Sequence, residues 1–281
     1  MEQMREKYES LSAFVLKDLA KARGLKGISS LKKGQIIDRM VEEDEREAKE
    51  AAANGISEED RVSSFRDDYA ALDSGEEASG ILEVMPEGFG FIRCENYMPG
   101  DHDIYVAPSQ IRRFNLKTGD IIKGNTKVKS EREKFQALLY VTSVNGYTPA
   151  EAQSRTSFEN LIPIFPDERL RLERKGASVA MRVVDLISPI GKGQRGMIVS
   201  QPKAGKTTLL KEVAKSVKAN NPEIHLIILL IDERPEEVTD IKEAIEGDNV
   251  EVIYSTFDEL PDHHKRVSEM VIERAKRLVE H

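Results

Sequence analysis

Apolar residues recur at helical spacing in the first 43 residues of the chain and at strand spacing after residue 80. A first helix is predicted from apolar residues three and four positions apart, which are Leu11, Phe14, Val15 and Leu19. Gly24 is a suitable residue to end this helix, and Ser29 and Ser30 are suitable to cap a second one. The second helix is predicted from the same spacing in Ile36, Ile37, Met40 and Val41. The two segments together predict a small helical module.

Short apolar runs separated by turn residues follow between residues 80 and 147. The predicted strands read GILEVM, GFGFIRC, DIYVA, GDIIKG and ALLYVTSV. Five strands in roughly 65 residues are typical of a small barrel of the oligonucleotide-binding or cold-shock kind.

From residue 176 onward, predicted strands alternate with amphipathic helices. GMIVS (196–200) precedes the helix TTLLKEVAKSVKA, IHLIILLID precedes EEVTDIKEAI, and NVEVIYS precedes HHKRVSEMVIERAKRLVE. Buried strands that are each followed by an amphipathic helix indicate a parallel sheet with crossover helices. The fold class predicted for the whole chain is therefore multidomain, α+β and α/β.

The predicted organisation has five parts. They are a helical module over 1–43, an acidic linker over 44–79, the barrel over 80–147, a connector over 148–175 and an α/β domain over 176–281. Residues 42–77 hold 14 Asp and Glu against 4 Lys and Arg, in a chain whose formal net charge is -8. This charge argues against a protein that coats nucleic acid by bulk electrostatics, but the rest of the chain is nearly balanced and leaves room for a local basic site.

Composition also bears on the compartment. The chain has no run of eighteen apolar residues, and its first residues are polar and acidic, so neither a membrane span nor a secretion signal is predicted. The single cysteine, Cys94, permits no internal disulfide and fits a reducing, cytoplasmic setting. We expect Cys94 to lie in the core.

Residues 199–210 read VSQPKAGKTTLL and contain most of a phosphate-binding loop. Gly205, Lys206 and Thr207 match the end of the pattern G-x-x-x-x-G-K-[ST], while Ser200 stands where the leading glycine is usual. In such a loop the N–H groups at the start of the next helix bind phosphate, the lysine reaches the β- and γ-phosphates, and the threonine hydroxyl ligates Mg²⁺. The pattern predicts a nucleotide site, and the alternative is an ordinary strand–turn–helix whose Gly and Lys are incidental.

Two neighbouring segments carry groups suited to a nucleotide. Upstream, residues 191–196 read GKGQRG, with three glycines and two cations, although a plain turn would have the same composition. Downstream, an apolar run ends in Asp232, Glu233 and Arg234. The glutamate suits a general base that activates the attacking water, and the arginine suits a charge sensor near the phosphates. The alternative is a helix capped by Asp232, with Glu233 and Arg234 on the surface.

The strand GFGFIRC is predicted to show aromatic side chains to solvent. Side chains alternate across a strand, so Phe89, Phe91 and Arg93 share one face, while Ile92 and Cys94 share the other. The exposed face suits single-stranded nucleic acid, because bases stack on aromatic rings at ~1–3 kcal/mol each and a guanidinium can meet a phosphate or a base edge. The alternative is that the two phenylalanines belong to the core.

The neighbouring barrel strands repeat this arrangement. Asp103 and Tyr105 lie on one side of the next strand, with Ile104 and Val106 on the other, and Phe135 enters the last strand. If the phenylalanines were buried, the aliphatic residues of both strands would point outward, so we expect the aromatic face to be the outer one.

The segments GFGFIR, DIYV, GKGQRG, PKAGKT and LIDERPEEVTD occur in this order. Together with the barrel they resemble the Rho family of bacterial transcription termination factors, from about residue 11 to the last residue, and IDERPEEVTD is the most specific part. The resemblance implies a helical module on an oligonucleotide-binding barrel as the primary RNA site, and a RecA-like ATPase domain that forms a homohexameric ring. It implies ATP and Mg²⁺ as cofactors, pyrimidine-rich single-stranded RNA and RNA polymerase as partners, and helicase activity that releases transcripts.

The resemblance also assigns roles to residues. The implied RNA-binding residues are Gly88, Phe89, Gly90, Phe91, Ile92, Arg93, Asp103, Ile104, Tyr105, Glu133, Lys134 and Phe135. The implied nucleotide-binding residues are Gly191, Lys192, Gly193, Gln194, Arg195, Gly196, Lys203, Ala204, Gly205, Lys206, Thr207, Thr208 and Arg234. Glu233 corresponds to the catalytic base, Lys206 and Arg234 assist it, and Thr207 holds Mg²⁺ through ATP.

Past residue 281, where this sequence stops, the family continues with the metal-binding strand, the RNA loops of the central pore and the arginine finger. We therefore expect a partial RecA-like domain whose sheet of about three strands is incomplete. Two hypotheses follow: the N-terminal part of an RNA-dependent ATPase and helicase, or an RNA-binding fragment without ATP turnover. A third, a cold-shock-like RNA chaperone fused to an unrelated nucleotide-binding domain, is disfavoured by residues 232–240.

Overall fold

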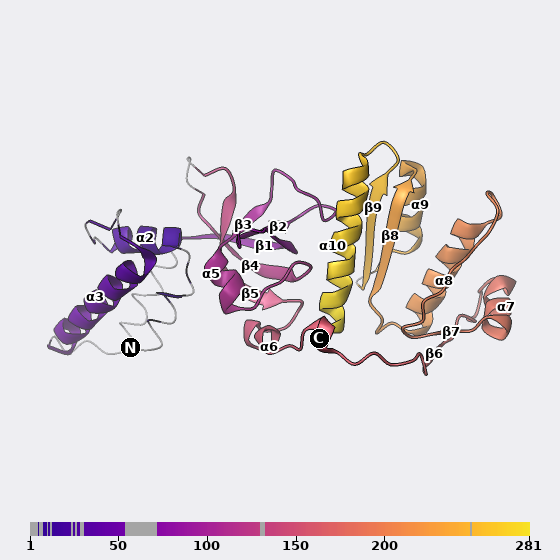
Figure 1. Cartoon of the computed structure of the whole chain (residues 1–281), viewed down its shortest axis with the longest axis horizontal. Coiled ribbons are helices and arrows are strands. Elements are labelled where there is room, and N and C mark those ends of the chain that lie inside the picture. The colour runs from indigo at the N-terminus through magenta and orange to yellow at the C-terminus, as the bar shows by residue number, and fades with distance from the viewer. Residues whose placement is uncertain are drawn as a thin grey trace. The chain divides into compact units, whose positions relative to one another are not determined.

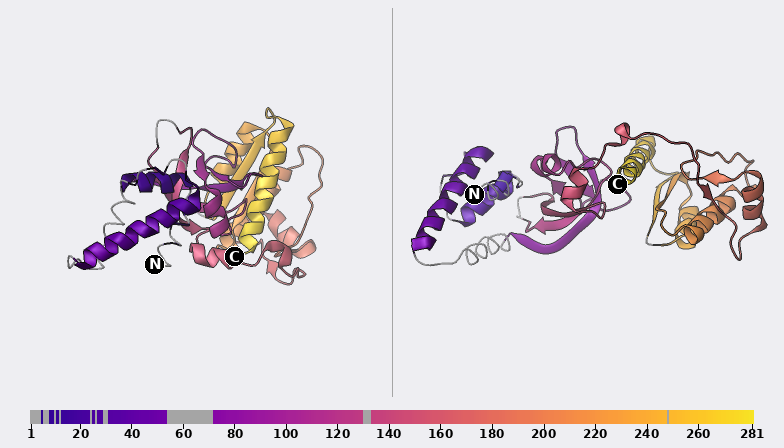
Figure 2. Two further views of the ribbon diagram at one scale, coloured as in Figure 1. Left: turned by 60° about the vertical axis from the view of Figure 1, so that its left-hand side comes forward. Right: turned by 90° about the horizontal axis from the view of Figure 1, so that it is seen from below.

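The computed structural model describes residues 5, 8–9, 11, 13–23, 25, 27–28, 31–53, 72–129, 133–247 and 249–281. The chain divides into two compact units, Met1–Phe158 with Ile272–His281, and Glu159–Val271. Figure 1 shows the elements in chain order, and Figure 2 shows them from two further directions. Each unit is considered by itself.

The N-terminal helices of the first unit pack on each other around an apolar cluster. Helix α2 (Ala13–Ala22) and helix α3 (Lys33–Ala53) bury Val15, Leu19 and Ile36 completely or nearly so. The Tyr8 hydroxyl donates to Asp44 at 2.7 Å, and Arg23 pairs with the same carboxylate at 2.7 Å. Both predicted helices are confirmed, while the predicted end at Gly24 and the caps at Ser29 and Ser30 lie outside the described residues.

The barrel of the first unit closes in the order β1-β2-β3-β5-β4. Its strands are β1 (Asp73–Val84), β2 (Gly90–Arg93), β3 (Ile104–Val106), β4 (Ile121–Lys127) and β5 (Gln136–Val144). All neighbours are antiparallel except β3 and β5, whose parallel pairing closes the barrel. The predicted five-stranded barrel is confirmed.

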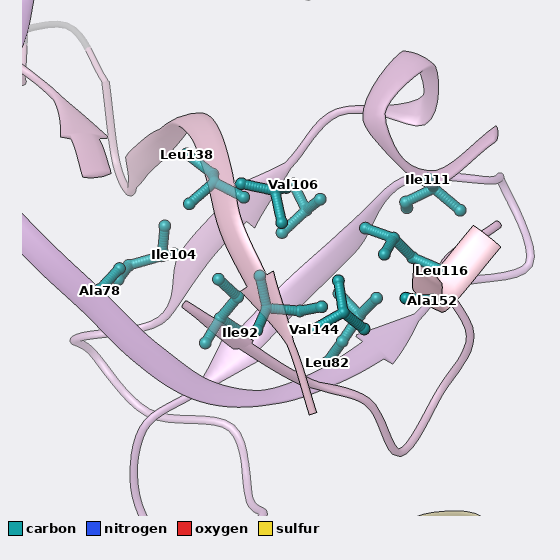
Figure 3. Close-up of a cluster of buried hydrophobic side chains, with 12 residues drawn as sticks. Ala78, Leu82, Ile92, Ile104, Val106, Ile111, Leu116, Leu138, Val144 and Ala152 are labelled. Carbon is teal, nitrogen blue, oxygen red and sulfur yellow. The ribbon is translucent and has the colours of Figure 1, made fainter. Parts of the chain in front are cut away.

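Alternate side chains from every strand fill the barrel interior. Figure 3 shows Leu82, Ile92 and Val144 pointing toward one another from β1, β2 and β5. At Gly124 in β4, a side chain would overlap the carbonyl oxygen of Tyr140 on β5, so only glycine permits this close pairing. The alternation of the sequence therefore sets the inner face, and glycine allows the sheet to curve closed.

Short helices and the last residues of the chain complete the first unit. Helix α5 (Pro108–Arg113) and helix α6 (Pro149–Gln153) pack on the barrel. The residues of helix α10 (Pro261–Val279) from Ile272 on belong to this unit, and a side chain at Gly119 would overlap the backbone of Glu273. Arg155 is buried and pairs with Asp120 at 2.6 Å and with Glu280 at 3.0 Å. These buried charges fix the C-terminal turn on the barrel.

The second unit contains a two-stranded parallel sheet with helices packed on it. Strands β8 (Leu226–Glu233) and β9 (Val250–Thr256) run side by side (Figure 1), and helix α9 (Pro235–Ala244) connects them. Helix α8 (Lys206–Asn220) packs on the sheet through Ala214, which contacts Ile241 of α9 in one apolar cluster. This is the parallel α/β arrangement predicted from the alternating pattern.

The remaining elements of the second unit precede α8. They are a 3₁₀ turn η1 that starts in the first unit (Phe158–Asn160), strand β6 (Arg169–Leu170), helix α7 (Val179–Ile187) and strand β7 (Ile190–Gly191). Asp185 of α7 accepts hydrogen bonds from the N–H groups of Leu172 and Glu173 at 3.0 and 2.7 Å. Strands β6 and β7 pair with each other and with no other described strand.

The segment before α8 differs from its prediction. The predicted strand over 196–200 is wrong: these residues form no strand, and Met197 is 87% exposed. Apolar composition alone does not make a strand, because the backbone also needs a neighbour to bond with, and no described strand lies beside this segment. Within the stretch 44–79, α3 extends to Ala53 and β1 begins at Asp73.

Among the residues that the structure describes, no helix is both long and apolar enough to cross a membrane.

Candidate nucleic-acid interface and phosphate loop

Four aromatic rings gather on the outside of the barrel, and we call them the aromatic platform: Phe89, Phe91, Tyr105 and Phe135. The centroid of the Phe91 ring lies 5.7 Å from that of Phe89, 6.1 Å from that of Tyr105 and 5.1 Å from that of Phe135. All four rings are half-buried, so each keeps part of its surface open to solvent. Partial burial raises the pKa of the Tyr105 hydroxyl above its ordinary value.

Strand pairing brings the four rings together. Phe91 of β2 lies opposite Tyr105 of β3, and the parallel pairing of β3 with β5 places Tyr105 opposite Ala137, two residues after Phe135. The alternate residues Ile92 and Ile104 point into the buried core. The predicted outer aromatic face is therefore confirmed, and the alternative that the phenylalanines form the barrel core is wrong.

Arg93 does not stand open to solvent as expected. It is only 6% exposed, and its guanidinium pairs with Glu83 at 2.7 Å and with Asp103. The same guanidinium lies 4.9 Å from the centroid of the Phe91 ring. The pairing follows from strand register, because β1 places Glu83 opposite Phe91, beside Arg93. Arg93 thus contacts the Phe91 ring while the two carboxylates pair with its guanidinium.

Neighbouring residues show further departures from the expectations. Cys94 is exposed rather than buried, because β2 ends at Arg93 and the alternation stops there. Gly90 is buried, and a side chain on it would come within 2.9 Å of the Glu83 carbonyl oxygen, so its small size serves the approach of β1. Gly88 adopts φ +89 in the turn that leads into β2.

The segment before β5 adds charge to one edge of the platform. The Lys134 ammonium lies 5.1 Å from the centroid of the Phe135 ring and is exposed. Glu133 is half-buried and lies 3.6 Å from the ammonium of Lys127 at the end of β4. A cation beside stacked rings favours the negative backbone of a single strand.

The predicted phosphate loop turns sharply before α8. Lys203 and Gly205 have φ of +62 and +85, and α8 begins directly afterwards at Lys206. The loop residues 201–206 are exposed, so the N–H groups and the two lysines at the helix start are accessible. A helix N-terminus with open N–H groups attracts anions. The geometry fits phosphate, and Thr207 at the second position of α8 would supply a hydroxyl to a phosphate-bound cation.

The GKGQRG segment forms a turn that is partly fixed by its own side chains. The Gly191 N–H donates to the Gln194 side chain at 2.8 Å, and Gly193 adopts φ +81. Lys192 donates to Glu168 at 2.5 Å, a hydrogen bond that raises the pKa of the lysine. Arg195 and Gly196 are exposed beyond the turn.

Glu233 and Arg234 follow the carboxyl end of β8. Asp232 has φ +57, Glu233 lies opposite Thr256 of β9, and Arg234 is the N-cap residue of α9. A salt bridge joins Lys211 of α8 with Asp240 of α9. Each partner lies five residues beyond the first residue of its helix, or about 8 Å along the axis. This contact joins the helix that follows the phosphate loop to the helix that follows Glu233 and Arg234.

The described residues contain no group of three or more His, Cys, Asp or Glu placed to hold a metal ion. His263 and His264 pair instead with Glu259 at 3.5 Å and with Ser255 at 2.8 Å.

Sequence reasoning missed two charged residues near the platform: Glu83, which pairs with Arg93, and Lys127, which pairs with Glu133. Glu83 stands at an outward position of β1, which alternation reveals, but nothing in the sequence shows that β2 places Arg93 beside it. Lys127 is a buried cation whose partners lie at residues 18 and 133. Partners so distant in sequence leave no local signal.

Comparisons with known proteins match two separate parts of the chain, the barrel and the second unit. Residues 78–150 match the family described as "Rho termination factor, RNA-binding domain", and residues 180–276 match "ATP synthase alpha/beta family, nucleotide-binding domain". The fold and the two sites therefore define a protein that joins a nucleic-acid-binding barrel to a nucleotide-binding domain.

Relatives named "Transcription termination factor Rho" match most of the chain. The protein from Pseudomonas aeruginosa is 54% identical over 215 residues, which are 74% of this chain and 51% of the relative. The one from Bacillus subtilis is 52% identical over 72% of this chain and 47% of its own length, and the one from Chromobacterium violaceum is 48% identical over 82% and 55%. The chain belongs to the transcription termination factor Rho family. It spans about half the length of the curated relatives it matches.

Proposed function

We propose that the barrel binds single-stranded, pyrimidine-rich RNA on the aromatic platform. The observation that carries this proposal is the set of four half-exposed rings on one outer face of the barrel, in which the centroid of each ring lies 5.1–6.1 Å from that of at least one other. Rings so placed offer stacking surfaces to successive bases, and the exposed Lys134 favours the backbone. The match of residues 78–150 to an RNA-binding family supports the same ligand. The remaining residues of the RNA set, Gly88 to Arg93, Asp103 to Tyr105 and Glu133, shape or flank the platform.

We further propose that the second unit binds ATP with Mg²⁺. The loop residues Lys203 to Thr208 and the turn Gly191 to Gly196 contact the nucleotide, and Lys206 neutralises the β- and γ-phosphates. Magnesium, when bound, withdraws charge from the phosphates. Glu233 accepts the proton of the attacking water, and Arg234 stabilises the charge that develops.

At the level of the whole protein we propose an ATP-dependent RNA helicase that terminates transcription. Its relatives carry the name transcription termination factor Rho, which supports a role in ending transcription. Release of transcripts from RNA polymerase, a homohexamer and a cytoplasmic location belong to the same proposal and rest on the resemblance to the Rho family. We also propose the domain limits 1–43, 44–79, 80–147, 148–175 and 176–281, which rest on the changes of residue pattern along the sequence.

RNA binding is tested by replacing the central ring of the platform. Phe91→Ala removes the ring that contacts the other three aromatic side chains, and loss of one stacked base at ~1–3 kcal/mol weakens binding about 5- to 150-fold. The measurement is fluorescence anisotropy of a labelled oligocytidine titrated with the 281-residue chain. Phe257→Ala, which removes an exposed ring of the second unit, is the matched control. Equal affinity of the Phe91→Ala chain and the wild type contradicts the proposal.

Nucleotide binding is tested at the first residue of α8. Lys206→Ala is expected to weaken binding of a fluorescent ATP analogue, while Lys215→Ala, on the same helix but beyond the loop, leaves it unchanged. Glu233→Gln is expected to preserve ATP binding and to abolish RNA-stimulated phosphate release wherever the wild type shows it. Binding that is indifferent to Lys206 refutes the phosphate assignment.

A further inference from the structure

Lys127 is a buried cation that bridges two carboxylates from distant parts of the first unit. Its side chain is 5% exposed at the end of β4. The ammonium lies 2.6 Å from the Asp18 carboxylate in α2 and 3.6 Å from the Glu133 carboxylate before β5. The three groups join the helical module, the barrel and the edge of the aromatic platform.

The charges of this bridge make it dependent on the lysine. An ammonium taken out of water needs carboxylates beside it, and removal of the ammonium leaves both carboxylates without this counter-charge. Asp18 also lies 3.6 Å from Lys21, one turn further along α2, and Glu133 lies 3.6 Å from Lys127. The position of Glu133 is therefore tied to the position of α2.

Glu133 lies at the start of the segment that carries one ring of the platform. It is followed directly by Lys134 and Phe135, whose ring contacts Phe91 at 5.1 Å. A shift of Glu133 moves the start of this segment and with it the ring and the exposed ammonium of Lys134. The bridge therefore acts on platform geometry without touching a base.

The helical module is docked firmly enough to serve as an anchor. Leu139 of β5 is buried in the apolar cluster of α2 and α3, and the Ser109 hydroxyl of α5 donates to the Leu11 carbonyl at 3.1 Å. Residues 78–150 alone match the RNA-binding family, so nothing in that match gives Asp18 or its helix a part in RNA binding.

We propose that Lys127 is a positioning residue through which helix α2 sets the RNA affinity of the aromatic platform. Asp18 holds the lysine, the lysine holds Glu133, and Glu133 holds the segment that carries Phe135. The helical module is thus an active part of the RNA-binding unit. This inference rests on the proposed RNA-binding function of the platform.

The experiment measures binding of labelled oligocytidine of about 12 nucleotides, within the usual range for one such barrel, to the 281-residue chain over a series of salt concentrations. Lys127→Met keeps the unbranched side chain, shorter by one atom, and removes its charge, and it is expected to weaken binding about tenfold. Lys127→Arg keeps the charge and is expected to restore affinity to within about threefold of the wild type. Asp18→Asn is expected to weaken binding about threefold, although the residue lies in the helical module.

Three controls separate positioning from other roles. Asp38→Asn removes an exposed carboxylate of the same module that pairs with Arg5, and it is expected to change nothing. The double variant Asp18→Asn with Lys127→Met is expected to bind as well as Lys127→Met alone, because both changes break one bridge. The slope of log affinity against log salt is expected to be unchanged in Lys127→Met, whereas loss of a direct phosphate contact lowers it by about 0.7.

Each outcome decides the proposal. Wild-type affinity in Lys127→Met at a temperature where circular dichroism shows it folded, a salt slope lowered by about 0.7, or full affinity in Asp18→Asn overturns it. If Lys127→Met does not fold, Asp18→Asn decides, since this carboxylate is partly exposed. If the wild type shows no binding that depends on Phe91, the proposed function fails and the inference with it; Phe91-dependent binding that ignores Lys127 and Asp18 overturns the inference alone.

Discussion

Replacing Arg93 gives a direct test of the buried pairing beneath the aromatic platform. Arg93→Met removes the guanidinium and leaves the Asp103 carboxylate, 3% exposed, and the Glu83 carboxylate without their cation. Removing one partner of a buried ion pair costs about 3–5 kcal/mol. Because part of the Glu83 side chain reaches solvent, we take the lower end, about 3 kcal/mol of barrel stability.

Hydrogen–deuterium exchange followed by mass spectrometry resolves the barrel from the second unit. A loss of about 3 kcal/mol speeds exchange of the protected β1 and β2 amides about 100-fold. One such amide is Leu82 N–H, which donates to the Asp120 carbonyl at 2.7 Å. Arg5→Met, which breaks an exposed pair with Asp38, is the control and changes exchange less than about threefold.

Unchanged exchange in the variant would refute the buried pairing. If Arg93→Met leaves exchange of β1 and β2 within about threefold of the wild type, the guanidinium is not a buried counter-charge. A lowered salt slope of RNA binding with unchanged exchange would instead support the phosphate contact that alternation alone had predicted.

Two further predictions concern stability in each unit. Gly124→Ala is expected to lower the barrel's unfolding free energy by about 1–3 kcal/mol, because the new methyl group overlaps the Tyr140 carbonyl. Gly34→Ala in α3, where no atom lies within 4 Å of the new methyl group, is expected to raise the unfolding free energy by up to about 1 kcal/mol. Thermal unfolding followed by circular dichroism checks both changes. Burial alone would raise the pKa of Asp185, but the Leu172 and Glu173 N–H groups and Arg169 hold it below its ordinary value. Its contribution is therefore fully present above pH of about 4 and is lost as the pH falls through the lowered pKa. Urea titrations of the second unit should show this pH dependence reduced in Asp185→Asn, and an identical profile in wild type and variant contradicts the assignment.

Short patterns in the sequence correctly predicted the two faces of β2 and the start of α8. The alternation in GFGFIRC placed Ile92 inside the barrel and Phe91 outside, because a strand turns successive side chains to opposite faces. The glycine before Lys206 marked the start of α8, because φ of +85 suits glycine at that turn.

Predictions failed where the outcome depended on a distant partner. The segment 196–200 has the composition of a strand but no described neighbour to pair with, and Cys94 lies beyond the end of β2, where alternation no longer applies. Arg93 was expected at the surface because the sequence does not show that β1 brings Glu83, and the loop before β3 brings Asp103, against its guanidinium.

The sequence by itself determined the order of the helical module, barrel and nucleotide-binding unit, the inner and outer faces of the barrel strands, and the phosphate loop, since periodicity, glycine and short motifs act over a few residues. Only the tertiary structure decided that Arg93 is buried between Glu83 and Asp103 and that Lys127 pairs with Asp18 of α2 and with Glu133. These features arise from strand register and from charge pairs between residues up to 109 positions apart. Contacts at that distance are selected by the packing of the whole unit, so no local pattern in the chain can reveal them.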